Sequence, residues 1–127
     1  DPIAELPVDG TPYDVRAPTR VGNLAFDTAF GEVKHANVRE GRGDVAWLTA
    51  PDGSRTTLWQ DTAWGYVQVF TTHAMATADG PMDAIAIEPM TAPPDALNSG
   101  QGLLWLEPGS SWEGSWGLRY ARGNEGN

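Results

Sequence analysis

Short apolar segments broken by glycine and proline run through this chain of 127 residues, and no long stretch repeats with the 3.6-residue period of an amphipathic helix. Fifteen glycines and ten prolines are spread along the sequence, which is typical of short strands joined by turns. Six tryptophans add large side chains that favour strands and sandwich cores. The pattern predicts an all-β fold, an antiparallel β-sandwich or part of one, in a single domain covering residues 1–127.

Several strands are marked by local patterns. Pro51-Asp52-Gly53 separates the apolar runs 44–49 and 55–60, which is a strong hairpin signal. Residues 65–72 alternate bulky side chains on both faces and therefore predict a central strand. Residues 83–88 predict another buried strand.

The two ends of the chain are less regular. Residues 1–23 carry prolines at intervals, so we expect them to be irregular and extended. Near the C-terminus, residues 103–107 and 112–120 are expected to form a closing antiparallel pair around a turn at 107–110. Residues 123–127 are expected to form a disordered tail.

Charge and composition exclude several classes of partner. The formal net charge is −9, which argues against nucleic acid and anionic membrane surfaces. No apolar run approaches the roughly 18 residues of a membrane-spanning helix. The chain has no cysteine, which excludes disulfides and thiolate metal sites.

A carboxylate at the end of a buried strand is the first candidate for chemistry. The apolar run 84–87 leads directly into Glu88, and Pro89 lacks the N–H group that a strand ladder uses. We therefore expect the strand to end with Glu88 at its tip, beside a stiff loop that contains Pro93 and Pro94. A carboxylate held in this way is well placed to transfer a proton. The alternative is a solvated glutamate at a strand end.

Three segments together resemble a known family. EPMTAPPDA begins at Glu88, PVDGTPYDVR covers residues 7–16, and LLWLEPGS covers residues 103–110 ahead of Trp116-Gly117. In this order they are similar to motifs of the aldose 1-epimerase (mutarotase) family, although Val15 stands where the family usually has phenylalanine. The resemblance implies that the chain is the C-terminal part of a large galactose mutarotase-like supersandwich, completed by the N-terminal part of the same protein.

The resemblance also implies a reaction. Mutarotation interconverts the α and β anomers of a free aldose: a base takes the proton of the anomeric hydroxyl while an acid protonates the ring oxygen. Glu88 would be the base, and the acid would be a histidine from the N-terminal part of the protein. The substrate would be a hexose in the cytoplasm, and no cofactor or metal ion would be needed.

Asp27 is the second candidate residue. It lies between Phe26 and Phe30 in an apolar stretch, so it should be hydrogen-bonded or part of a site if it is buried. In the resembled family an aspartate at this place binds substrate hydroxyl groups; the alternative is a turn aspartate that caps backbone amides. Gln68 lies on the expected central strand, needs hydrogen-bond partners there, and by the resemblance belongs to a strand beneath the sugar.

Other polar residues are given structural roles. His35 and His73 are the two histidines of the chain, neither lies in a motif of the family, and both are expected at the surface. Asp14 and Arg16 would share one face of an extended segment and could pair. We expect them to fix a loop near the site, with direct contact to a sugar hydroxyl as the alternative.

The sequence leaves other functions open. A non-catalytic carbohydrate-binding β-sandwich module fits the tryptophan content and the missing acid. Asp27 and Glu88, 61 residues apart, would also suit a glycosidase pair if their carboxylates lay close in space. A fragment with only a packing role predicts no sugar binding. In a partial sandwich, unpaired strand edges would favour self-association.

Overall fold

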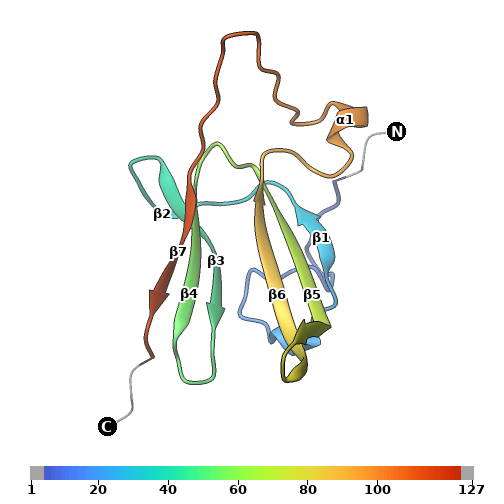
Figure 1. Ribbon diagram of the computed structural model, residues 1–127, viewed down its shortest axis with the longest axis vertical. Coiled ribbons are helices and arrows are strands. Elements are labelled where there is room, and N and C mark those ends of the chain that lie inside the picture. Colours follow the sequence, from blue (N-terminus) through green and yellow to red (C-terminus); the bar gives the residue numbers. More distant parts are fainter. Residues whose placement is uncertain (1–4, 124–127) are drawn as a thin grey trace.

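The computed structural model describes residues 5–123, so residues 124–127 of the expected tail lie outside this range. Within it, seven strands form two antiparallel sheets, accompanied by one short 3-10 helix and one short α-helix (Figure 1). The all-β, sandwich-like fold predicted from the sequence is confirmed. The two helices of the described segment are both too short to cross a membrane.

The first sheet has three strands in the order β1-β5-β6: β1 (Asp27–Phe30), β5 (Tyr66–Thr77) and β6 (Gly80–Met90). As predicted, the strand that contains residues 66–72 is the central one. β5 and β6 form a long hairpin in which Thr77 pairs with Gly80 across the turn. Gly80 has a φ of +106°, a conformation that residues with a side chain rarely adopt, so glycine suits this tight turn.

The second sheet has four strands in the order β2-β3-β4-β7: β2 (Ala36–Arg39), β3 (Arg42–Thr49), β4 (Arg55–Asp61) and β7 (Trp116–Ala121). The predicted hairpin between β3 and β4 is confirmed, with Pro51, Asp52 and Gly53 in its turn. The carboxylate of Asp52 accepts a hydrogen bond from the backbone N–H of Ser54 at 2.8 Å, which stabilises the turn.

The chain crosses between the two sheets three times, at residues 31–35, 62–65 and 91–115. The third crossing is long and projects beyond the sheets (Figure 1), and it includes α1 (Ala96–Ser99). The expected strand at residues 103–107 is wrong, because this segment is irregular and pairs with no strand among residues 5–123. Instead of closing on that segment, β7 occupies the free edge of β4. Whether an apolar run forms a strand depends on the neighbours it can pack against as well as on its own residues.

The N-terminal segment packs beside the start of β1 through an aromatic ring, and it contains an ion-pair cluster of its own. It is irregular, as expected, apart from the 3-10 helix η1 (Val21–Asn23). The ring of Tyr13 stacks on the buried Phe26 with their centroids 5.6 Å apart. Arg16 donates from Nε and Nη2 to the two carboxylate oxygens of Asp14 at 2.8 and 2.7 Å, and these bonds hold the pKa of Asp14 below its usual value. The pairing that the sequence suggested is therefore present.

Candidate functional site

Three polar side chains from three different strands lie in a row across the first sheet. Gln68 on β5 donates a hydrogen bond from Nε2 to Oδ1 of Asp27 on β1, with 2.8 Å between the two atoms. On its other side, Gln68 stands directly opposite Glu88 of β6. Residues in register on neighbouring strands project from the same face, and Asp27 stands opposite Phe70, two residues from Gln68. Asp27, Gln68 and Glu88 therefore share one face, and we call them the polar row.

The structure corrects the expected position of Glu88. The strand does not end at this residue, because β6 continues through Pro89 to Met90. Pro89 stands in register with Val67 of β5, so pairing persists past the proline. β6 is an edge strand of its sheet, and proline is tolerated there since its missing N–H can face the unpaired side. Glu88 is thus fixed within a strand rather than at a strand tip.

The carboxylate of Glu88 is open to a ligand. Its side chain is exposed, and no hydrogen-bond donor among residues 5–123 engages it. Asp27 is also exposed, and one of its two carboxylate oxygens is taken by Gln68. The polar row therefore offers one unoccupied carboxylate and, two strands away, one carboxylate that an amide holds in place.

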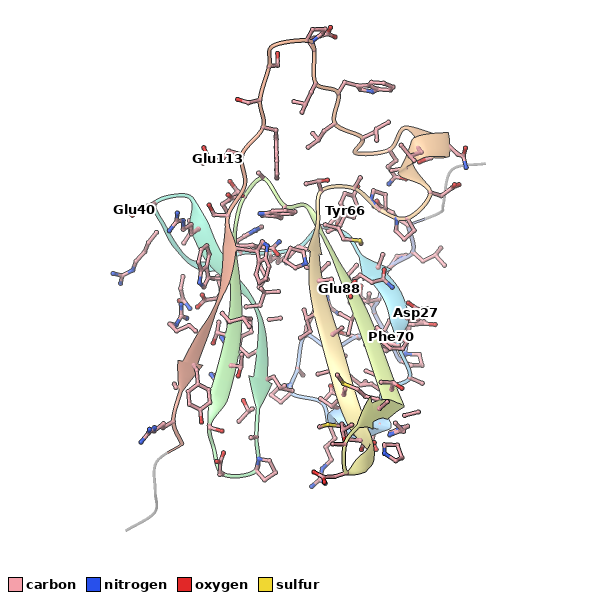
Figure 2. The ribbon with its side chains drawn as sticks, viewed as in Figure 1. Asp27, Glu40, Tyr66, Phe70, Glu88 and Glu113 are labelled. Carbon is pink, nitrogen blue, oxygen red and sulfur yellow. The ribbon has the colours of Figure 1, made fainter. Side chains whose placement is uncertain are left out.

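Two aromatic residues flank Gln68 along β5. Tyr66 and Phe70, which Figure 2 labels, lie two residues before and after it. The alternation of a strand therefore places all three side chains on the same face. The ring of Tyr66 is enclosed by Gly31 and Gly102, where a Cβ atom would come within 3.2 Å of ring carbons. Close approach of the backbone thus fixes Tyr66 at one end of the face. The ring of Phe70 is 43% exposed near Asp27.

This combination of groups suits a polyol. Carboxylates accept hydrogen bonds from hydroxyl groups, and an amide side chain both donates and accepts. Aromatic rings present flat apolar surfaces against which the C–H face of a sugar can pack. The polar row and its two aromatic neighbours therefore form an open platform with the groups needed to bind a hexose.

The two carboxylates stand on opposite sides of Gln68. Asp27 and Glu88 are separated by two inter-strand spacings and an offset of two residues, which places their Cα atoms roughly 12 Å apart. The carboxyl groups of a retaining glycosidase pair lie about 5 Å apart. In inverting enzymes the two carboxyl groups lie roughly 6.5–9.5 Å apart, so the glycosidase pair stays a prediction.

Neither histidine lies beside the polar row. His73 pairs with Asp83 through Nδ1 and Oδ1 at 2.8 Å, and both side chains are exposed, as expected for His73. Both residues fall in the alternation that points to the opposite face of the sheet from Glu88. His35 lies in the crossing to the second sheet with Nε2 3.1 Å from the carbonyl oxygen of Asp61. It is half-buried, so its expected exposure is wrong.

No group of three or more histidine, cysteine, aspartate or glutamate residues between residues 5 and 123 is arranged to hold a metal ion.

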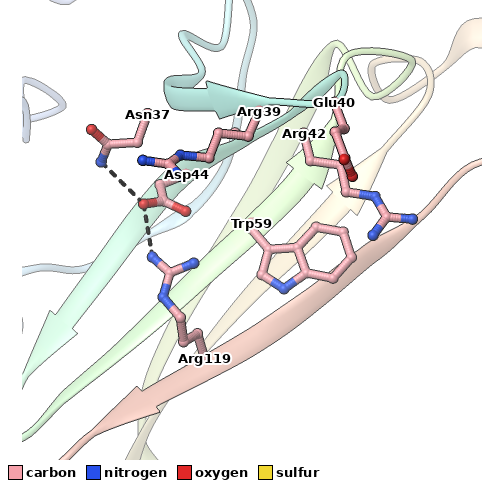
Figure 3. A pocket seen from close by; sticks show the side chains of 8 residues that line it. Asn37, Arg39, Glu40, Arg42, Asp44, Trp59 and Arg119 are labelled. Carbon is pink, nitrogen blue, oxygen red and sulfur yellow. Dashed lines mark hydrogen bonds and ion pairs between the residues drawn. The ribbon is translucent and has the colours of Figure 1, made fainter.

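A separate hollow of about 280 Å³ lies on the second sheet (Figure 3). There the nearly buried Asp44 accepts hydrogen bonds from Nη2 of Arg119 at 2.8 Å and Nδ2 of Asn37 at 3.2 Å. The bond from Arg119 is the main cause that holds the pKa of Asp44 below its usual value. These contacts tie β3 to β7 across β4, where Arg42 lies 5.0 Å above the Trp59 ring.

Comparison with protein-family models, with curated proteins and with solved structures gave no match for this chain. The resemblance to the aldose 1-epimerases therefore rests on the quoted motif residues, which include Glu88. The structure brings Glu88 and the second candidate, Asp27, to one face. Gln68 was not assigned to the site from the sequence. The sequence feature that could have identified Gln68 is a polar side chain within an otherwise apolar strand. In the structure this side chain hydrogen-bonds to Asp27.

Proposed function

We propose that this protein is an aldose 1-epimerase-like isomerase that interconverts the α and β anomers of a free hexose in the cytoplasm. The proposal is supported by the polar row, in which an unoccupied carboxylate shares a face with an amide–carboxylate pair. Glu88 acts as the base, and Asp27 and Gln68 bind ring hydroxyl groups and orient the sugar. Tyr66 and Phe70 border the bound ring.

In the proposed reaction, Glu88 accepts the proton of the anomeric hydroxyl while an acid donates a proton to the ring oxygen. The bond between C1 and the ring oxygen breaks, and an open-chain aldehyde forms. Rotation about the C1–C2 bond presents the other face of the aldehyde to the ring hydroxyl. Closure reverses both proton transfers and gives the other anomer, so no cofactor or metal ion takes part.

The acid is assigned to a group outside residues 5–123. Both histidines lie away from the polar row. We infer that the N-terminal part of the same protein supplies the acid above the sugar. The chain of 127 residues alone is then expected to bind hexoses without accelerating anomer exchange.

A non-catalytic carbohydrate-binding module is the second candidate. It is favoured by the open platform and by the lack of a histidine near Glu88. The two proposals agree on the binding face. They differ in whether the full-length protein catalyses the exchange of anomers.

Two measurements test the proposal. The first titrates the 127-residue chain with glucose and galactose and follows backbone amides by NMR; shifts are expected at Asp27, Gln68 and Glu88. The second follows anomer exchange of freshly dissolved sugar by polarimetry with the full-length gene product and its Glu88→Gln variant. Exchange that depends on Glu88 supports the isomerase, binding without exchange supports the module, and an absence of both overturns the two proposals together.

A further inference from the structure

The chain exposes far more surface than a compact protein of its mass. Its accessible surface is 9610 Å², whereas a folded monomer of 13.6 kDa has about 6,600 Å². Strand β7 contributes strongly, because Trp116, Leu118 and Tyr120 are 53%, 65% and 64% exposed. These three residues alternate along the strand, so they form one apolar stripe on one face of the second sheet.

β7 is also the sheet edge that lacks protection. Of the other three edge strands, β1 and β2 have only four residues each, and β6 contains Pro81 and Pro89. Short edge strands and prolines are the usual means of preventing further strand pairing. β7 has six residues and contains no proline. Its outer edge can therefore accept another strand.

The backbone of β7 presents its free groups at the same three residues that form the stripe. Asp61 of β4 donates a hydrogen bond from its N–H to the carbonyl of Ser115 at 2.9 Å, so the backbone groups of Ser115 face β4. In an antiparallel ladder this direction alternates from one residue to the next. The N–H and C=O groups of Trp116, Leu118 and Tyr120 consequently point to the open edge.

We propose that two copies of this chain associate through β7, in an antiparallel pair centred on Leu118 and related by a two-fold axis. Leu118 then lies opposite its own copy, and Trp116 lies opposite Tyr120 of the second copy. All three pairs exchange backbone hydrogen bonds, and the two four-stranded sheets become one continuous sheet of eight strands. Aromatic and aliphatic pairs of this kind are favourable cross-strand neighbours.

Charge and area agree with this register. Arg119 falls opposite Gly117 of the second copy, so no like charges face each other at the axis. The excess surface of about 3,000 Å² is spread over the whole chain and is larger than the roughly 800 Å² that each partner buries in a standard interface; the three exposed side chains of β7 contribute to it. The proposal does not rest on the proposed sugar chemistry, because the polar row lies on the other sheet.

Sedimentation velocity of the 127-residue chain over a hundredfold range of concentration tests the association. We expect a dimer of the 13.6-kDa chain that dissociates on dilution. Leu118→Lys places two like charges at the axis and should give a monomer with an unchanged far-ultraviolet circular dichroism spectrum. Leu106→Lys, at a similarly exposed leucine in the long crossing, should leave the dimer intact. A monomer at every concentration, or a dimer that resists Leu118→Lys, overturns the proposal.

The absence of cysteine allows the register to be tested directly. Leu118→Cys places two thiols opposite each other across the axis, at a separation that a disulfide can span. With oxidised glutathione as the oxidant, this variant should form a covalent dimer rapidly, whereas Leu106→Cys should link only slowly. Equal rates for the two variants, or faster linking of Leu106→Cys, would show that the copies do not meet at β7.

Discussion

Gln68 and Asp27 are 41 residues apart in the sequence and are joined by a hydrogen bond of 2.8 Å from Nε2 to Oδ1. The bond fixes the orientation of both side chains before any ligand arrives. One oxygen of Asp27 and the carbonyl oxygen of Gln68 are left to accept hydrogen bonds from hydroxyl groups. Binding a sugar to this pair therefore requires little further loss of side-chain entropy.

Replacing Glu88 by glutamine should abolish anomer exchange in the full-length protein, since an amide cannot accept the anomeric proton. Loss of a general base lowers the rate by about 100-fold or more. The rate is measured by polarimetry or by NMR exchange. Glu113→Gln makes the same change of charge at an exposed residue far from the polar row (Figure 2) and should exchange normally. Near-wild-type exchange by Glu88→Gln would remove the base from the mechanism.

Asp27→Asn should weaken hexose binding by about tenfold, which corresponds to about 1.4 kcal/mol. The new side chain can still accept the bond from Gln68, but its second polar atom becomes a donor and no longer accepts from a hydroxyl. Affinity is measured by titration calorimetry. Asp79→Asn in the β5–β6 turn removes the same charge and should bind as the wild type does. Equal losses in the two variants would indicate a general effect of charge.

Gly117→Ala should destabilise the second sheet. A Cβ atom at this position would lie 2.5 Å from Cζ2 of the Trp59 ring, which covers β7 there. Forced overpacking of this kind costs about 1–3 kcal/mol. Urea unfolding of dilute protein, followed by tryptophan fluorescence, measures the loss. Gly65→Ala meets no atom within 4 Å and should change the free energy of unfolding by much less.

Stability should fall in acid partly through Asp44. The hydrogen bond from Arg119 lowers the pKa of Asp44 in the folded state, so its contribution is complete above the unfolded value of about 3.9. The contribution is lost as the pH falls through the lower, folded pKa. Arg119→Met should cost about 1.5–3 kcal/mol near neutral pH, and it should make the loss of stability in acid smaller, because the folded pKa of Asp44 then lies closer to its unfolded value.

Urea unfolding at a series of pH values checks this behaviour. Arg122→Met, which removes an exposed positive charge near the end of β7, is the matched control. It should leave both the stability near neutral pH and the start of the acid transition unchanged. A wild-type pH profile for Arg119→Met would mean that the ion pair contributes nothing to folding.

Local patterns predicted the parts of the fold that local chemistry decides. The turn at Pro51, Asp52 and Gly53 determines the β3–β4 hairpin within a few residues, and alternation of bulky side chains marked β5 as central. The pairing of residues 103–107 was wrong because strand pairing depends on which edge is free, and β4 lies far away in the sequence. The sequence predicts that Pro89 ends the strand, but β6 continues to Met90 because an edge strand tolerates proline.

For the candidate site, the sequence predicts Glu88 from the apolar run before it and from a family motif, and Asp27 from its apolar surroundings and the family resemblance. It does not predict that the two residues share one face. Their relation depends on the registers of β1 and β6 against β5, which are set by contacts between distant segments. For Gln68, the sequence predicts only that a polar side chain on a central strand needs a hydrogen-bond partner. The structure shows that the partner is Asp27 and that Gln68 stands opposite Glu88 in the sheet.

The insertion of β2, β3 and β4 between β1 and β5 has a kinetic consequence. Gln68 and Glu88 belong to a hairpin closed by a tight turn, whereas Asp27 reaches Gln68 only after a loop of 41 residues has closed. Short loops close at a lower entropic cost and generally earlier than long ones. During refolding, Gln68 and Glu88 should therefore come together first, in the β5–β6 hairpin. Asp27 should join them last, when β1 pairs with β5.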